Sequence, residues 1–217
     1  SGDKDVTALG GITFEVKEGE FAALMGPSGS GKSTLLTMLG AMNPPTSGSV
    51  IIDGIDVYSL PQEKLADFRS EYLGFVFQQF QLIPYLTAVE NVMLPLSITG
   101  ISNKEQTLLA EGVLEKVGLA GKEDRLPNQL SGGEQERVAI ARAIVNEPPI
   151  LFADEPTGAL DSKTSEEIMM LFKRLNDEGQ TIIMVTHNEE FMTHAKRALF
   201  IRDGLLDKTR SGGKIAV

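Results

Sequence analysis

Short apolar runs alternate along the chain with longer segments of helical periodicity. Three of these runs, at residues 21–25, 150–153 and 181–185, are almost unbroken. A strand that is covered on both faces of a parallel sheet has this pattern, because neither face meets water. Residues 12–16 alternate instead between apolar and polar positions, which predicts a strand with one wet face before a turn at Gly19. The pattern therefore predicts an α/β protein with a parallel core sheet and an N-terminal antiparallel β region.

Helical periodicity is clearest in two stripes. One helix is predicted between Asp161 as its N-cap and Gly179 as its stop. Its apolar stripe consists of Ile168, Leu171, Phe172 and Leu175, and the second stripe consists of Ala110, Val113, Leu114 and Val117. Between about residues 74 and 145 helical patterns with proline interruptions replace the strand runs. We therefore expect one domain over residues 1–217, with a core formed by residues 1–73 and 146–217 and an inserted helical subdomain at about 74–145.

The segment GPSGSGKST, residues 26–34, lies between the first buried run and an apolar helical run. Its glycines let successive backbone N–H groups point at one anion, and the following helix adds its positive end. Lys32 would place its charge on the β- and γ-phosphates of a nucleotide, Ser33 would bind Mg²⁺, and Thr34 would support the α- or β-phosphate. A glycine-rich turn without a ligand is the alternative, but a lysine among three glycines packs poorly. The candidate binding residues are Gly26, Pro27, Ser28, Gly29, Ser30, Gly31, Lys32, Ser33 and Thr34.

Two acidic residues follow the apolar run at 150–153. A Mg²⁺ ion beside a phosphate loop needs a carboxylate at the end of a neighbouring strand, and Asp154 holds that position. Glu155 comes one residue later and is placed to polarise an attacking water as a general base. The alternative is a polar turn that merely closes the strand, and the phosphate loop makes this alternative less favoured.

The sequence LSGGEQ, residues 130–135, precedes a long helical run. Ser131 followed by Glu134 has the spacing of a capping box, which alone needs only a structural explanation. Two glycines in the first turn of a helix cost about 1 kcal/mol each relative to alanine, however, and they leave bare N–H groups for a phosphate. We therefore keep both interpretations, a helix cap and a second anion site.

Together these motifs resemble the ATP-binding subunit of ABC transporters, whose signature is LSGGQ. The LSGGEQ variant resembles the branch of macrolide-exporter, lipoprotein-release and cell-division-type members. The resemblance covers essentially the whole chain, implies a P-loop NTPase fold, and adds Gln78 in GFVFQ, Asp161 in TGALD and His187 in VTHNEE in the family order. Gln79 is a less favoured candidate beside Gln78.

The resemblance further implies a head-to-tail homodimer around two ATP molecules, each with Mg²⁺. Each ATP would lie between the 26–34 loop of one copy and the signature of the other, with Asp161 across the interface. His187 would contact the γ-phosphate, and Gln78 would sense Mg²⁺ and the attacking water. The signature residues that bind nucleotide would be Ser131, Gly132, Gly133 and Gln135. The implied catalytic residues are Glu155, His187 and Gln78, and the implied metal-binding residues are Ser33, Gln78 and Asp154.

Structural alternatives remain for several of these residues. Thr186 and Glu189 have capping-box spacing around His187, so that histidine alone would more often be an ordinary surface residue. Asp161 is expected to cap a helix whatever else it does. His194 is assigned no role.

Adenine recognition is the least defined part of the expected site. Members of this branch usually carry an aromatic residue, upstream of a segment like residues 6–9, that stacks on adenine. Here no aromatic residue precedes Phe14, and the chain opens at Ser1 rather than at a methionine. We therefore expect the first residues of the protein to be missing from this sequence, and we assign no adenine contact.

The amino-acid composition excludes several classes of binding partner and chemistry. A net charge of −10 disfavours nucleic acid, zero cysteines exclude thiol chemistry, and two histidines argue against a histidine metal site. No apolar run reaches the roughly 18 residues that a membrane span needs, so we expect no direct insertion. The resemblance instead implies integral membrane permease subunits and a peripheral place on the cytoplasmic face of the membrane. Residues 80–96 resemble the surface that receives a coupling helix, with ordinary subdomain core as an equal alternative.

The motifs are compatible with three functions for this chain. The first is an ATPase that drives transport through separate membrane subunits, by export or by lipoprotein or peptide handling. The second is ATP-driven transmembrane signalling without transport, which the motifs do not separate from the first. A soluble ABC ATPase that acts on DNA or ribosomes is less favoured, because the 122 residues from Lys32 to Asp154 leave no room for a long coiled-coil insertion.

Overall fold

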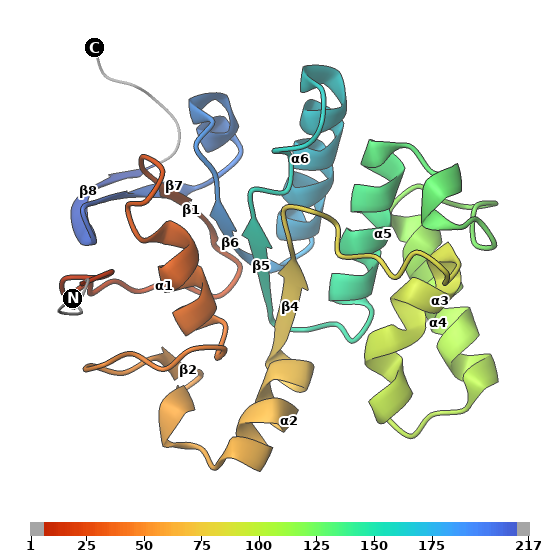
Figure 1. The fold of residues 1–217 in the computed structure, drawn as a ribbon, viewed down its shortest axis with the longest axis horizontal. Coiled ribbons are helices and arrows are strands. Elements are labelled where there is room, and N and C mark those ends of the chain that lie inside the picture. Colours follow the sequence, from red (N-terminus) through yellow and green to blue (C-terminus); the bar gives the residue numbers. More distant parts are fainter. Residues whose placement is uncertain (1–6, 212–217) are drawn as a thin grey trace, which may run out of the picture.

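A six-stranded sheet forms the centre of the molecule in the computed structural model, which describes residues 7–211 (Figure 1). Its strands lie in the order β4 (Leu73–Val76), β5 (Ile150–Asp154), β6 (Thr181–Val185), β1 (Phe21–Met25), β7 (Arg197–Arg202) and β8 (Leu205–Ser211). The first five are parallel, and β8 pairs antiparallel with β7. The three predicted buried strands are confirmed, and the parallel sheet also includes β4, so it extends slightly past the predicted boundary at residue 74.

The antiparallel region differs from the prediction at residues 12–16. Ile12, Phe14 and Val16 are half-buried while the residues between them are exposed, so the predicted wet and dry faces are confirmed. The predicted strand is wrong, because this part of the described chain pairs with no strand of either sheet. A separate antiparallel pair is formed by β2 (Ile51–Ile52) and β3 (Ile55–Asp56).

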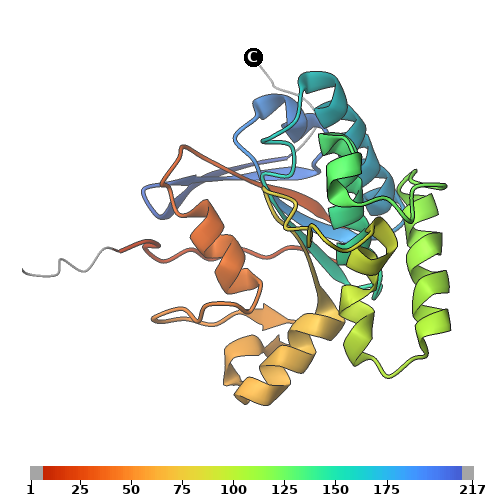
Figure 2. The same cartoon turned by 45° about the vertical axis from the view of Figure 1, so that its right-hand side comes forward.

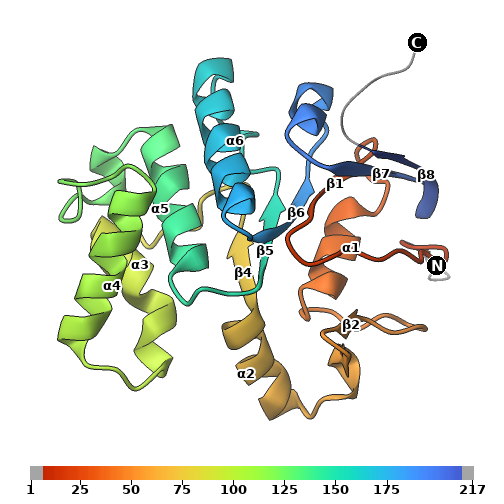
Figure 3. The ribbon, with the colours of Figure 1, turned by 180° about the vertical axis from the view of Figure 1, so that it is seen from behind.

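Helices cover both faces of the sheet. Helix α1 (Lys32–Leu39) lies on the face seen in Figure 1, and α6 (Ser162–Asp177) lies on the face seen from behind in Figure 3. Alternate residues of β1 face the two sides: Phe21 joins the core that includes α6, and Leu24 joins the core that includes α1. Strands buried on both faces explain the unbroken apolar runs of the sequence.

The remaining helices lie on the β4 side of the sheet. Helix α2 (Gln62–Tyr72) leads into β4, and α3 (Ala88–Met93), α4 (Asn103–Lys116) and α5 (Gly132–Ile144) form a group between β4 and β5 in the chain (Figures 1 and 2). The second predicted stripe packs inside this group, with Ala110 and Leu114 fully buried. Short 3-10 helices cover η1 (Val57–Ser59), η2 (Leu94–Ile98), η3 (Pro127–Gln129) and η4 (Glu189–Thr193). No helix within residues 7–211 is both long and apolar enough to cross a membrane.

Candidate functional site

The phosphate loop has the strand, loop and helix context that the sequence predicts. It joins the end of β1 to Lys32, the first residue of α1. Gly26 has φ 149°, and a Cβ there would lie 2.0 Å from the carbonyl oxygen of Ile201. Gly31 has φ 100°, and a Cβ there would lie 2.7 Å from the oxygen of Ala8. Neighbouring backbone therefore requires glycine at both positions.

The Lys32 ammonium lies within the curve of this loop. Its Nζ donates hydrogen bonds to the carbonyl oxygens of Gly26 at 2.9 Å and Pro27 at 2.8 Å, and the residue is only 6% exposed. Ser30 is buried in the same loop, and its Oγ has no hydrogen-bond partner among the described residues. A fixed cation beside a buried, unpartnered hydroxyl suits an anion such as a phosphate.

Ser33 and Asp154 meet at the end of β5. The Ser33 Oγ donates to the Asp154 Oδ1 at 3.3 Å. Burial raises the pKa of the Asp154 carboxyl, and the nearby Glu155 charge acts in the same direction, while the Ser33 hydrogen bond and the Lys32 charge lower it. Placing a positive ion here would offset the unfavourable burial of this charge.

The donors of this pair fit Mg²⁺. A hydroxyl and a carboxylate are hard oxygen ligands, and Mg²⁺ usually takes only one or two protein ligands, with phosphates and water supplying the others. No group of three or more His, Asp or Glu side chains within residues 7–211 is placed to hold a metal ion by itself. Ser33 and Asp154 would therefore hold the ion together with the phosphates of a nucleotide.

Glu155 and His187 lie side by side at the same edge. The Glu155 Oε1 is 3.2 Å from the Nδ1 of His187, whose side chain is mostly exposed. Glu155 has φ 46°, in the left-handed region, and its N–H donates to the carbonyl of Val185 at 3.0 Å. Backbone strain of this kind concentrates at functional positions.

Gln78 lies in the turn after β4 and approaches the segment that follows Glu155. A Cβ on Gly158 would lie 3.2 Å from the Gln78 Nε2 and 3.3 Å from the Glu155 carbonyl oxygen. Gln78 is exposed, and so is Gln79. The carboxyl ends of β1, β4, β5 and β6 thus bring together the phosphate loop, Gln78, the two acids and His187, at the edge to which the arrows of β4, β5 and β6 point in Figure 1.

The LSGGEQ segment starts α5 and has the predicted capping box. The Ser131 N–H donates to the Glu134 Oε2 at 2.8 Å, and the Glu134 N–H donates to the Ser131 Oγ at 3.4 Å. Gln135 donates from its side-chain amide to the Leu130 carbonyl at 3.1 Å. Lys122 makes an ion pair with Glu134 and lowers the pKa of that carboxyl, a contact that sequence reasoning missed.

The two glycines of this segment lie against neighbouring elements. A Cβ on Gly133 would lie 2.4 Å from the Cγ2 of Thr164 in the first turn of α6, and one on Gly132 would lie 3.2 Å from Leu160. Close approach of α5 to α6 is therefore a structural reason for glycine at 133, which the sequence interpretation did not include. This reason adds to the earlier one, that glycines leave bare N–H groups for an anion.

Asp161 caps α6 as predicted. It accepts from the Thr164 N–H at 3.0 Å and from the Thr164 hydroxyl at 2.6 Å, and these bonds lower its pKa. The capping box expected at Thr186 and Glu189 is wrong, because Asn188 caps η4 by accepting from Glu190.

Two further residues, His194 and Arg142, were not predicted to have a role. His194 is largely buried and lies 3.4 Å from the Glu166 carboxylate on α6, which is a structural contact. Sequence reasoning missed Arg142, whose only signal is a basic residue inside an apolar helical run.

Comparison with known proteins identifies related chains over nearly the full length. Residues 9–158 match the family described as ABC transporter. An uncharacterised ABC transporter ATP-binding protein of Bacillus subtilis, YknY, is 50% identical over 211 residues, which is 97% of this chain and 92% of that protein. The macrolide export ATP-binding/permease protein MacB of Rhodopirellula baltica is 51% identical over 94% of this chain, which spans 30% of MacB.

Solved structures extend this similarity to the fold. The dimeric structure of MJ0796, described as a bacterial ABC transporter cassette, has a TM-score of 0.90 and 45% identity, over 99% of this chain and 95% of that one. A second dimeric MJ0796 structure, in a post-hydrolysis state with bound ADP and Pi, has a TM-score of 0.89 and 44% identity over the same shares. The curated MJ0796 protein is from Methanocaldococcus jannaschii and is 48% identical over 95% of this chain and 90% of that protein.

Proposed function

Because this chain belongs to the ABC transporter family, as an ATP-binding domain, we propose that two copies bind ATP with Mg²⁺, hydrolyse it and drive conformational change in separate membrane subunits. One observation carries the proposal. A fixed lysine, a Ser33–Asp154 oxygen pair and a Glu155–His187 pair share the carboxyl edge of one sheet. The relatives named for macrolide export suggest that the movement serves export.

The loop residues bind the triphosphate in this proposal. Backbone N–H groups of residues 26–34 and the start of α1 face the phosphates, and Lys32 neutralises charge on the β- and γ-phosphates. Ser33 and Asp154 would hold Mg²⁺, which when bound would supply charge stabilisation to the phosphoryl group. Thr34 supports the α- or β-phosphate. Lys32 and the helix start act locally, so they overcome the repulsion expected from a net charge of −10.

Hydrolysis is assigned to the three side chains at the ends of β4, β5 and β6. Glu155 accepts the proton of the attacking water, whose oxygen bonds to the γ-phosphorus as the bond to the ADP oxygen breaks. His187, adjacent to the Glu155 carboxylate, contacts the γ-phosphate. Gln78 reaches this edge from its turn and would orient the attacking water.

A second copy is needed to complete each site. Ser131 is the N-cap of α5. Helix α5 lies beyond strand β4 at one side of the sheet, whereas α1, which follows the phosphate loop, lies toward the other side (Figure 1). We therefore assign Ser131, Gly132, Gly133 and Gln135 to the nucleotide held by the other copy, in a head-to-tail dimer with Asp161 across the interface. The dimeric form named for the MJ0796 cassette supports this assembly.

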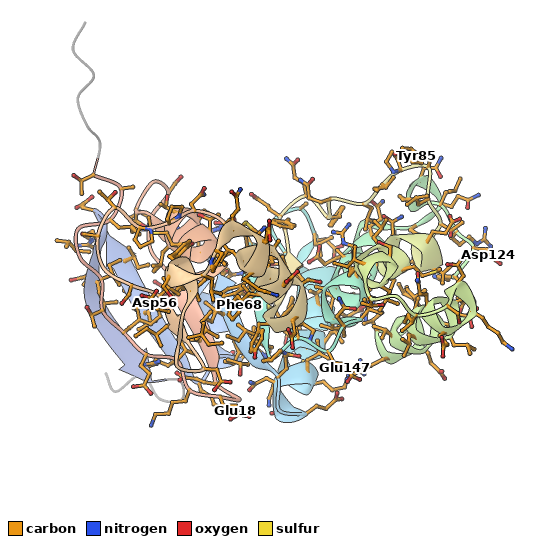
Figure 4. All side chains as sticks on the ribbon, turned by 90° about the horizontal axis from the view of Figure 1, so that it is seen from below. Glu18, Asp56, Phe68, Tyr85, Asp124 and Glu147 are labelled. Atoms are coloured by element: carbon orange, nitrogen blue, oxygen red, sulfur yellow. The ribbon has the colours of Figure 1, made fainter. Side chains whose placement is uncertain are left out.

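The membrane partner is assigned to the surface between α2, β4 and the helical group. A cavity of about 330 Å³ lies there, with Ser70, Phe75, Pro95 and Asn146 among its lining residues. Tyr85 and Ile98 are 77% and 74% exposed, and Figure 4 places Tyr85 at the helical end of the molecule. Relatives that carry an ATP-binding and a permease part under one name support a membrane partner, and hence a place at the cytoplasmic face.

Phosphate release from ATP tests the proposal. The wild-type chain, measured with Mg²⁺, should release phosphate, and Lys32→Ala should lower the rate by about 100-fold because the phosphates lose their fixed cation. Lys64→Ala is the matched control, since Lys64 pairs with Asp67 on the exposed face of α2. Absence of phosphate release by the wild type, or equal rates for Lys32→Ala and Lys64→Ala, would overturn it.

A further inference from the structure

Arg142 connects α5 to the loop that carries Gln78. Its guanidinium donates two hydrogen bonds to successive backbone carbonyls, to Phe80 at 2.8 Å and to Gln81 at 2.5 Å. A guanidinium presents its donors in a rigid fork, so two bonds to adjacent carbonyls fix the orientation of both peptide groups. The side chain is half-buried, and these two carbonyls satisfy donors that would otherwise be costly to bury.

The loop at residues 77–81 has a backbone that needs such support. Phe80 and Gln81 have φ of 57° and 52°, so two consecutive residues with side chains are in the left-handed region. The Phe80 N–H donates to the Phe77 carbonyl at 3.1 Å, closing a turn around Gln78 and Gln79. Any change in the peptide groups at 80 and 81 therefore changes the direction in which the turn presents Gln78.

Glu136 is a buried acid near Arg142, but its carboxylate accepts no hydrogen bond from the guanidinium. Glu136 is fully buried on α5, and both of its carboxylate oxygens lack a hydrogen-bond partner among the described residues. Burial raises the pKa of Glu136 to about 9, while the Arg142 charge lowers it. The Glu136 carboxyl is thus neutral near pH 7, and the guanidinium bonds are directed at Phe80 and Gln81.

We propose that Arg142 is a positioning residue that holds the 77–81 loop in its left-handed turn, and thereby keeps Gln78 at the edge shared with Glu155. The proposal rests on the role given to Gln78 in the proposed function. Arg142 acts through the backbone of Phe80 and Gln81. Loss of the guanidinium frees the loop and lowers the population in which Gln78 faces the turn after Glu155.

Hydrogen exchange of backbone amides tests the structural half of the proposal. Arg142→Met removes the guanidinium and keeps an apolar stem, so amides of residues 77–82 should exchange about tenfold faster. Arg142→Lys, which keeps a cation able to reach one carbonyl, should give an intermediate rate. Arg137→Met is the matched control, because Arg137 lies on the same helix and donates to the Val117 carbonyl. Equal protection of residues 77–82 in Arg142→Met and Arg137→Met would overturn the proposal.

A double-mutant cycle tests the functional half. Arg142→Met and Gln78→Ala should each lower kcat for ATP by about tenfold with KM for ATP within about twofold, and the double variant should fall little further, because both changes remove the same contribution. A roughly hundredfold loss in the double variant, or an unchanged kcat in Arg142→Met, contradicts the proposal. If the wild-type chain releases no phosphate, the proposed function fails by itself, and the exchange measurement still decides whether Arg142 holds the loop.

Discussion

Three acidic side chains illustrate how position determines chemistry at the residue scale. Burial at the end of a core strand raises the pKa of Asp154. Glu155 lies beside His187, and Glu136 is a fully buried residue of α5. The sequence predicted the first two, since an acid after a buried strand must emerge at the sheet edge. It did not predict the burial of Glu136, because a glutamate one residue past LSGGEQ has no pattern that separates a core position from a surface one.

The role of Glu155 is tested by removing its charge and keeping its shape. Glu155→Gln should lower the rate of ATP hydrolysis by about 100-fold or more, because an amide cannot accept the proton of the attacking water. ATP affinity should stay near the wild-type value, since the phosphate loop is unchanged. Phosphate release and fluorescent-nucleotide titration measure the two quantities, with the exposed Glu189→Gln as control. Near-normal turnover in Glu155→Gln would remove it from the mechanism.

Glu136 makes the stability of the fold depend on pH. Its pKa is about 9 in the folded chain and about 4.3 when unfolded, so between these values the native state holds a proton that the unfolded state has lost. The free energy of unfolding should therefore fall as pH rises through this window, by roughly 1 kcal/mol per pH unit from this group. Glu136→Gln should flatten the slope and stabilise the fold at pH 8. An unchanged slope in urea unfolding from pH 6 to 8 would contradict this.

At the scale of single elements, capping residues determine where the helices begin. Capping boxes start α3, α4 and α5, and Asp161 caps α6. The box at Ser131 and the cap at Asp161 were predictable because a cap depends on residues within one turn. The contact of Gly133 with Thr164 was not, since it joins two helices that are distant in sequence. Strand β8 was missed for a different reason: it pairs with the adjacent β7, but its sequence has no apolar run.

The approach of α5 to α6 is tested by adding one methyl group. Gly133→Ala should destabilise the fold by about 1–2 kcal/mol, because its Cβ would overlap the Thr164 Cγ2 and overpacking outweighs the better helix propensity of alanine. Thr164→Ser removes that methyl and keeps the hydroxyl that bonds Asp161. The double variant should regain most of the lost unfolding free energy. Equal destabilisation in the single and double variants would contradict the packing argument.

The whole molecule is a scaffold that aligns chain segments from distant parts of the sequence. Three buried strands were predicted from apolar runs, and their parallel order brings Lys32, Asp154 and His187 to one edge. The alternation at residues 12–16 predicted burial correctly and hydrogen bonding incorrectly, because periodicity reports which face is dry and not which strand is adjacent. Neither Arg142 nor its hold on the 77–81 loop follows from any local pattern, since both ends of that contact are defined only by the tertiary fold.

In the proposed assembly ATP joins two copies of this chain, because each nucleotide would need the phosphate loop of one copy and the Ser131 segment of the other. Size-exclusion chromatography with light scattering of Glu155→Gln, with and without ATP and Mg²⁺, tests it most directly. We predict a monomer without nucleotide and a dimer with it, and no shift when Lys32→Ala is added to Glu155→Gln. An elution profile and mass that ATP leaves unchanged in Glu155→Gln would contradict the account.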